Sequence, residues 1–201
     1  MERYEIRTVA AAGEIENAPS VPLRFSDARY SVCPRTEAAV VYVKEQGFAC
    51  RMTCFEQAPH ATVTLADGDT YKDSCLEWFI NFAPARGEEY LNFEANAKGT
   101  LHCKFGEDRY VRHSLAELSA PRPTASATVA SGHWYVDYWI SLETIRAVFG
   151  VDHFCSGDVF RGNFYKCGDE TPSPHYGMWN PVTLERLDFH RPDFFGELIL
   201  L

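Results

Sequence analysis

The first stretch that could carry chemistry is "TYKDSCLEWFIN", residues 70–81, where Glu77 stands between the apolar residues Leu76 and Trp78 and Tyr71 lies just upstream. A carboxylate in such a run must reach solvent, pair with another group or bind a ligand, because burying an isolated charge is costly. Glu77 and Tyr71 are therefore candidate ligand-binding residues. A solvated position at the rim of the fold is the alternative for Glu77.

A second polar pattern lies in "EYLNFEANAKG", residues 89–99, where Tyr90, Asn92 and Glu94 alternate with Leu91 and Phe93. Alternation with a period of two gives a strand one polar face, which can line a groove or simply contact solvent. We take Asn92 as a candidate ligand-binding residue, with the solvated sheet face as the alternative.

Aromatic and polar residues gather in the last third of the chain, within "RGNFYKCGDETPSPHYGMWNP" and "DFHRPDFFG". Aromatic residues in turn-rich sequence form either a small satellite core or an exposed platform. Flat rings beside planar polar groups suit sugars, whose C–H faces stack on rings while their hydroxyls form hydrogen bonds. The candidates from this region are Trp179, Phe189, His190 and Arg191.

The segment "DFHRP" has two interpretations. As a site loop, Phe189 supplies a stacking face, His190 and Arg191 supply hydrogen-bond donors, and Pro192 stiffens the turn. As a structural segment, Phe189 and Phe194 cap the core and Arg191 pairs with Asp188 or Asp193.

Short alternating apolar runs separated by turn residues predict an all-β fold, an antiparallel β-sandwich, in a single domain covering residues 1–201. Strands are expected within residues 38–56, 61–66, 75–82, 89–95, 99–105, 133–141, 159–167 and 196–201. Residues 141–150 predict one short helix, with Ser141 as its N-cap and Gly150 as its stop. Residues 119–132, rich in Pro, Ser, Thr and Ala, predict a mobile loop.

Composition narrows the possible partners. The net charge of −9, without a cluster of Lys and Arg, argues against nucleic acid. No apolar run is long enough to span a membrane, and the charged start lacks the apolar core of a signal peptide, so a cytoplasmic protein is expected. The seven cysteines lack the spacing of a disulfide scaffold, and neither they nor other residues predict a metal site.

Taken in order, these segments resemble the family 9 carbohydrate-binding modules and their DOMON-like β-sandwich relatives, over residues 40–201. The resemblance rests on "KDSCLEWFIN", "YLNFEANAKGTL" and "FHRPDFFGELIL". It implies a DOMON-like, jelly-roll or immunoglobulin-like sandwich that holds a sugar between two aromatic side chains, with polar residues from adjacent strands fixing the hydroxyls.

By motif position, the resemblance places Tyr71 at one aromatic clamp, Phe189 near the second, and Glu77 at a ligand-binding glutamate. The sequence departs from the family pattern, which has Trp at both clamps in cellulose-binding members and a basic residue where Glu94 stands here. A different ligand or weaker stacking is expected. The calcium site of some relatives has no matching run of ligands, and no cofactor is expected.

Non-catalytic carbohydrate binding is therefore the predicted function, and two alternatives stay open. A glycoside-processing enzyme could use Glu77 with Asp169 or Asp188, or His175 with His190, because glycoside hydrolysis needs two suitably spaced acid–base groups. A haem-binding domain could use Met and His ligands, such as Met178 and His175. The sequence leaves the oligomeric state open.

Overall fold

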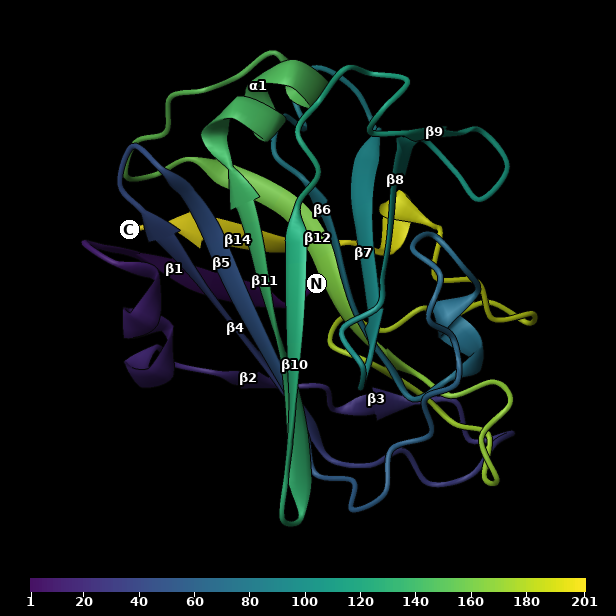
Figure 1. The fold of residues 1–201 in the computed structure, drawn as a ribbon. Helices are drawn as coiled ribbons and strands as arrows, with labels where there is room; N and C mark the ends of the chain where they lie inside the picture. Colours follow the sequence, from purple (N-terminus) through teal and green to yellow (C-terminus); the bar gives the residue numbers. More distant parts are fainter.

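In the computed structural model, which describes all of residues 1–201, the strands form two layers that β1 (Arg3–Val9) joins into one continuous sheet (Figure 1). The first layer contains β10 (Thr124–Ala130), β11 (His133–Ser141), β5 (Gly47–Cys54), β4 (Thr36–Val43) and the short β2 (Val21–Pro22). The second contains β14 (Gly196–Leu200), β12 (Val159–Cys167), β6 (Cys75–Asn81), β7 (Tyr90–Asn96), β8 (Leu101–Gly106) and β9 (Arg112–Ser114). At its side lie β13 (Tyr176–Met178) and β3 (Phe25–Ser26).

The strand β1 crosses between the layers. Its first half pairs parallel with β14, starting at Arg3 opposite Glu197, and its second half pairs parallel with β4, starting at Arg7 opposite Val41. The other strand pairs are antiparallel. The predicted all-β sandwich is confirmed as a fold class, and the two parallel pairings at β1 were not predicted.

The main core lies between the layers and follows the predicted alternation. On β5, the side chains of Phe48, Cys50, Met52 and Cys54 point inward and are at most 1% exposed. Four residues of the neighbouring strand β11 also point inward: Trp134, Val136, Tyr138 and Ile140. All seven cysteines are free, and five of them are buried, where a thiol packs as a small apolar side chain.

The predicted helix is α1 (Leu142–Phe149), which covers one end of the sandwich (Figure 1). The Ser141 hydroxyl accepts a hydrogen bond from the Thr144 backbone N–H at 3.1 Å, and Gly150 ends the helix with φ of 70°. Both features are the expected caps. With eight residues, this helix is far too short to cross a bilayer, and no other helix has the length or apolar character to do so.

Two predictions about local structure were wrong. The segment expected as a mobile loop contains β10, which pairs with β11 along its whole length and packs Ala125 and Ala127 against the core. The segment 61–66, expected as a strand, has no partner strand. Its backbone N–H groups at Thr62 and Val63 instead donate to the Asp73 carboxylate.

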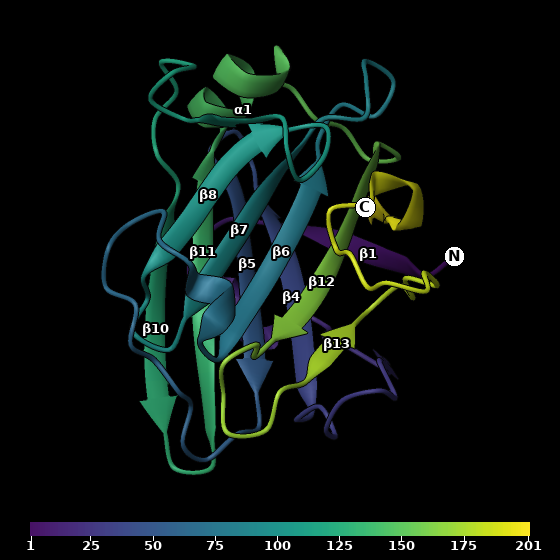
Figure 2. The ribbon, with the colours of Figure 1, turned by 90° about the vertical axis from the view of Figure 1, so that its right-hand side faces the viewer.

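The second layer is buried on both faces in its centre. On β6, Leu76, Trp78 and Ile80 point into the main core, while Glu77 and Phe79 point outward. Figure 2 shows this outer face, with the chain around β13 and η3 (Pro192–Phe194) beside β12, and η2 (Thr70–Lys72) over the ends of β6 and β7. The remaining short helix, η1 (Ala12–Asn17), packs against the first layer. The polar groups on β6 and β7 therefore lie at the bottom of a hollow.

Candidate functional site

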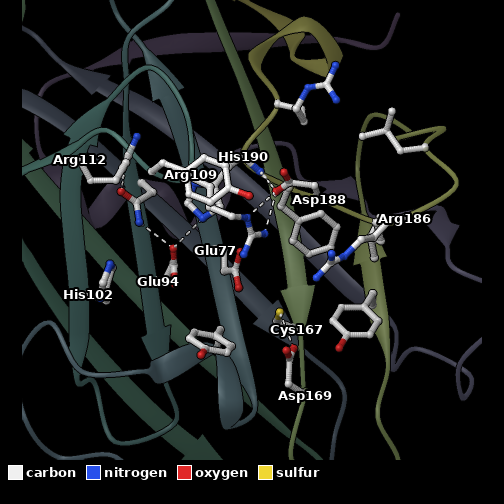
Figure 3. A pocket seen from close by; sticks show the side chains of 18 of the residues that line it. Glu77, Glu94, His102, Arg109, Arg112, Cys167, Asp169, Arg186, Asp188 and His190 are labelled. Atoms are coloured by element: carbon white, nitrogen blue, oxygen red, sulfur yellow. Dashed lines mark hydrogen bonds and ion pairs between the residues drawn. The ribbon is translucent and has the colours of Figure 1, made fainter.

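A cavity of about 800 Å³ opens on the outer face of the second layer. Its floor comes from the outward-pointing residues of β6, β7 and β8, its walls from residues 109–112 and 184–191, and part of its rim from Tyr71 on η2 (Figure 3). Ligand sites in proteins commonly have 300 to 1,000 Å³. This cavity is the candidate functional site.

Two carboxylates lie together on the floor. Glu77 of β6 stands directly opposite Glu94 of β7, and the two residues are only 2% and 4% exposed. Burial, and then the neighbouring Glu94 charge, raise the pKa of Glu77 well above its usual value. The pair therefore resists carrying two negative charges at once.

Asn92 connects this pair to an arginine. Its amide donates to the Glu94 carboxylate at 2.6 Å, and its carbonyl oxygen accepts a hydrogen bond from Arg112. Arg112 also donates to the backbone carbonyls of Lys104 and Gly106, and burial lowers its pKa. Asn92, completely buried, is thus held in one orientation with its amide N–H on Glu94.

His190 reaches the same floor from the C-terminal loop. Its Nδ1 lies 2.8 Å from the hydroxyl of Tyr90, and its Nε2 lies 3.9 Å from Glu94. Burial, together with Arg112 and Arg109, lowers the pKa of His190 to about 3, so the ring is neutral near neutral pH. Because Nε2 faces the Glu94 carboxylate, which is an acceptor, we assign the proton of the neutral ring to Nε2, and Nδ1 then accepts from the Tyr90 hydroxyl. The Nε2–H of His190 therefore faces the cavity floor.

Ion pairs shape the loop that carries His190. Asp188 accepts hydrogen bonds from Arg109 at 2.7 Å and from the His190 backbone N–H at 3.0 Å. Arg191 forms an ion pair with Asp193 at 2.7 Å, the pairing that the structural interpretation of this segment predicted. Arg191 still lines the cavity.

The two predicted clamp aromatics differ in accessibility. Tyr71 is 38% exposed at the rim, whereas Phe189 is 7% exposed and belongs to the small outer core. One face of the Phe189 ring is covered by Tyr165, with ring centroids 4.0 Å apart and an interplanar angle of 8°. Tyr176 contacts Phe189 edge-on. Phe189 lines the cavity and at the same time has the packing of a core residue.

This packing leads to a stability prediction for Phe189. We expect Phe189→Ala to lower the free energy of unfolding by about 3 to 4 kcal/mol, because it opens a void beside Tyr165. Thermal and urea unfolding would measure the loss. Phe55→Ala is the control, because Phe55 is 40% exposed, and should cost about 1 kcal/mol or less. A loss below about 1 kcal/mol for Phe189→Ala would show that its ring serves the ligand rather than the core.

One predicted site residue lies elsewhere. Trp179 is 3% exposed in the main core, next to Phe164, and a Cβ on Gly196 would meet its ring at 2.5 Å. Its side chain points to the inner face of the second layer, so Trp179 does not line the cavity. The other six predicted residues do: Tyr71, Glu77, Asn92, Phe189, His190 and Arg191.

The structure also separates some of the alternatives. His175 is buried outside the cavity, where its Nε2 lies 2.8 Å from the Lys166 ammonium, so it is not paired with His190. Asp169 and Asp188 both line the cavity with Glu77. Burial raises the pKa of Asp169. No group of three His, Cys, Asp or Glu side chains is arranged to hold a metal ion.

Several cavity residues were not among the predicted ones. Arg109 and Arg112 come from "GEDRYVRHS", which lies in a turn and a three-residue strand without recognisable periodicity. Glu94 was noted for its polar strand face but not assigned to the site. His102 and Lys104 of β8 also line the cavity, opposite Glu94 and Asn92. Their alternation with apolar residues is the pattern from which the sequence could have assigned them to the site.

Comparison with models of known protein families shows to which family the chain belongs. A model of a family described as carbohydrate-binding family 9 matches residues 21–200. The chain belongs to carbohydrate-binding family 9. Among proteins of curated function, none matches this chain.

Solved structures share the fold of this family 9 chain. A "putative carbohydrate-binding protein" from Bacteroides uniformis ATCC 8492 superposes with a TM-score of 0.82 at 23% identity, over 100% of this chain and 99% of the other. A family 9 module from Caldicellulosiruptor kristjanssonii in complex with glucose superposes with a TM-score of 0.71 at 11% identity, over 100% of this chain and 96% of the other. The module from the same organism in complex with cellotriose superposes with a TM-score of 0.71 at 10% identity, over 99% and 93%. At these identities the likeness shows the fold alone.

Proposed function

We propose that this family 9 protein binds a carbohydrate in the cavity without cleaving it. The observation that carries the proposal is the combination of a buried polar floor, made by Glu77, Asn92 and Glu94, with the half-exposed ring of Tyr71 at the rim. A sugar offers matching surfaces, because its hydroxyls need oriented polar partners and its C–H face packs on a flat ring.

In the proposed complex, the carboxylates of Glu77 and Glu94 accept hydrogen bonds from sugar hydroxyls, and the Nε2–H of His190 donates one. Tyr71 covers one face of the sugar ring. Phe189 contributes the part of its ring that Tyr165 leaves free, and Arg191 contacts the ligand at the rim. The cavity volume is sufficient for a monosaccharide or a short oligosaccharide.

The family supports this proposal through relatives with the same fold. The C. kristjanssonii modules were solved with glucose and with cellotriose. A glucose-type sugar is therefore the first ligand class to test.

The experiment compares Tyr71→Ala with the unsubstituted protein in calorimetric titrations with mono- and oligosaccharides. Removing a stacking ring should weaken binding about tenfold, equivalent to about 1.4 kcal/mol. Tyr135→Ala is the matched control, because Tyr135 lies half-buried outside the cavity, and should leave the affinity unchanged. Unchanged affinity in Tyr71→Ala would remove Tyr71 from the site.

The same mixtures test the absence of cleavage. Analysis of the oligosaccharides after long incubation should recover them intact. Release of smaller sugars, lost on replacing Glu77, Asp169 or Asp188, would make the protein a glycoside-processing enzyme instead.

A further inference from the structure

The floor of the cavity contains two acidic side chains, and a neutral sugar offers no positive charge to compensate them. Glu77 and Glu94 are directly opposed across β6 and β7, and like charges in such positions repel. The only basic side chain within 4.0 Å of either carboxylate is His190, at 3.9 Å from Glu94. That ring is neutral near neutral pH, because its pKa lies at about 3. The two nearly buried carboxylates thus lack a cationic partner.

The nearby arginines are already engaged. Arg109 is bonded to Asp188, and Arg112 is bonded to Asn92 and to backbone carbonyls. Asn92 supplies Glu94 with one donor. The Cys167 thiol lies beside Glu77 but donates to Asp169 at 3.4 Å. Figure 3 shows Glu77 and Glu94 side by side, and both line the cavity. Several acceptor positions on the pair are therefore open to a ligand.

A sugar hydroxyl fills such positions poorly, because it donates one hydrogen bond and carries no charge. A protonated amine donates three hydrogen bonds and compensates the negative charge of the pair. Charge-assisted hydrogen bonds of this kind are about twice as strong as neutral ones. The net charge of −9 on the whole chain also attracts a cationic ligand.

The cationic residues that line the cavity provide a less complete site for the carboxylate of an acidic sugar than Glu77 and Glu94 provide for an amine. Three of them are neutralised by carboxylates: Arg29 by Asp27, Arg109 by Asp188 and Arg191 by Asp193. Lys104 and Arg112 stand on the β8 and β9 side of the floor, and Arg186, which has no ion pair, lies on the wall made by residues 184–191. A sugar acid bound by these three residues would leave the Glu77–Glu94 pair unsatisfied.

We propose that the natural ligand is an amino sugar, whose protonated amine is held by Glu77 and Glu94. This inference rests on the proposed carbohydrate-binding function and narrows the class of sugar. The amine is a positive substituent on the ring, and the remaining hydroxyls keep the contacts described above.

The test measures calorimetric affinities for glucosamine, glucose, N-acetylglucosamine and glucuronic acid at about pH 6.5, where a primary amine is protonated. We expect glucosamine to bind at least about tenfold more tightly than glucose or N-acetylglucosamine, the factor that one additional charge-assisted contact provides. N-acetylglucosamine keeps the nitrogen but loses its charge, so it separates charge from shape.

Substitutions of Glu94 and Glu77 test whether these two residues cause the preference for glucosamine. In Glu94→Gln, and separately in Glu77→Gln, the ratio of glucosamine to glucose affinity should fall to about twofold or less, because each replaces a carboxyl group that can ionise against the ammonium by a neutral amide. Glu5→Gln removes the same charge from an exposed position on β1 and should keep the full ratio. Thermal unfolding confirms that each variant is folded, and either of the two site variants is sufficient for the test.

Equal affinities for glucosamine and glucose in the unsubstituted protein would overturn the amino-sugar inference and leave the proposed function intact. Tighter binding of glucuronic acid would overturn it in favour of Lys104, Arg112 and Arg186. Failure of these four sugars, and of the oligosaccharides tested for the proposed function, to bind the folded protein would overturn both proposals.

Discussion

Replacing Asp73 by Ala is expected to lower the free energy of unfolding by about 3 to 5 kcal/mol, the largest loss predicted for a single polar residue of this protein. The Asp73 carboxylate is buried and accepts hydrogen bonds from the Thr62 N–H and hydroxyl, the Val63 N–H and the Asn96 amide, at 2.8 to 2.9 Å. Despite burial, these donors lower the pKa of Asp73 below its usual value. Its loss leaves two backbone N–H groups without an acceptor.

Urea unfolding followed by tryptophan fluorescence would measure this effect. Asp69→Ala is the control, because Asp69 is exposed four residues earlier and makes only a surface ion pair with Lys72 at 3.4 Å. Its replacement should change the stability by about 0.5 kcal/mol or less. A loss for Asp73→Ala below about 1 kcal/mol would mean that the segment 61–66 is not held by this carboxylate.

The second large effect is acid destabilisation through His190. The folded pKa of about 3 lies below the usual His value of 6.5, so the unfolded chain takes up a proton first as the pH falls. Stability from the neutral ring is present above about pH 6.5 and is lost progressively down to about pH 3. The free energy of unfolding falls by up to about 1.4 kcal/mol per pH unit in this range, and by about 4 to 5 kcal/mol in total.

The comparison of His190→Gln with the unsubstituted protein isolates this contribution. It is needed because Glu77, whose pKa is raised, changes stability in the opposite direction as the pH falls. Between about pH 6.5 and 4.5, the unsubstituted protein should lose about 2 to 3 kcal/mol more than His190→Gln. His113→Gln, at an exposed histidine, should follow the unsubstituted protein. Parallel curves for the unsubstituted protein and His190→Gln would show that the ring is not held neutral.

The amino-sugar proposal and the acid sensitivity share one cause. Both follow from burial of polar groups on the outer face of the second layer, where water is replaced by the C-terminal loop. Residues 184–191 convert a sheet face that could have been solvated into the floor of a cavity. The polar face of residues 90–94 had both interpretations in the sequence, and the covering loop decides between them.

The local sequence pattern was sufficient to predict the strands that bury every second side chain. The alternation in β5 and β11, and the caps of α1, depend on neighbours in sequence and were predicted correctly. The order of motifs around Glu77 and His190 was also sufficient to indicate family 9, and six of the seven predicted residues meet in one cavity. Of these residues, Glu77 and Asn92 lie on β6 and β7, whose pairing follows from a short connection, whereas Phe189, His190 and Arg191 come from the C-terminal loop before β14.

Long-range pairing decided the rest. β1 finds its partners β14 and β4 across most of the chain, and β10 is a strand only because β11 offers a complete ladder. Segment 61–66 has strand-like residues, but its backbone N–H groups are satisfied by the Asp73 side chain, so it remains outside the sheet.

The sequence by itself determined the all-β class, the family and the strand faces that carry Glu77, Asn92 and Glu94, because these depend on periodicity and motif order. Only the tertiary structure decided that Trp179 belongs to the core, that Arg112 reaches Asn92, and that Glu77 stands opposite Glu94 without a cation. Those outcomes depend on strand register and on which face a loop covers. Both are set by contacts between residues that are distant in sequence, and such contacts leave no local pattern in the amino-acid sequence.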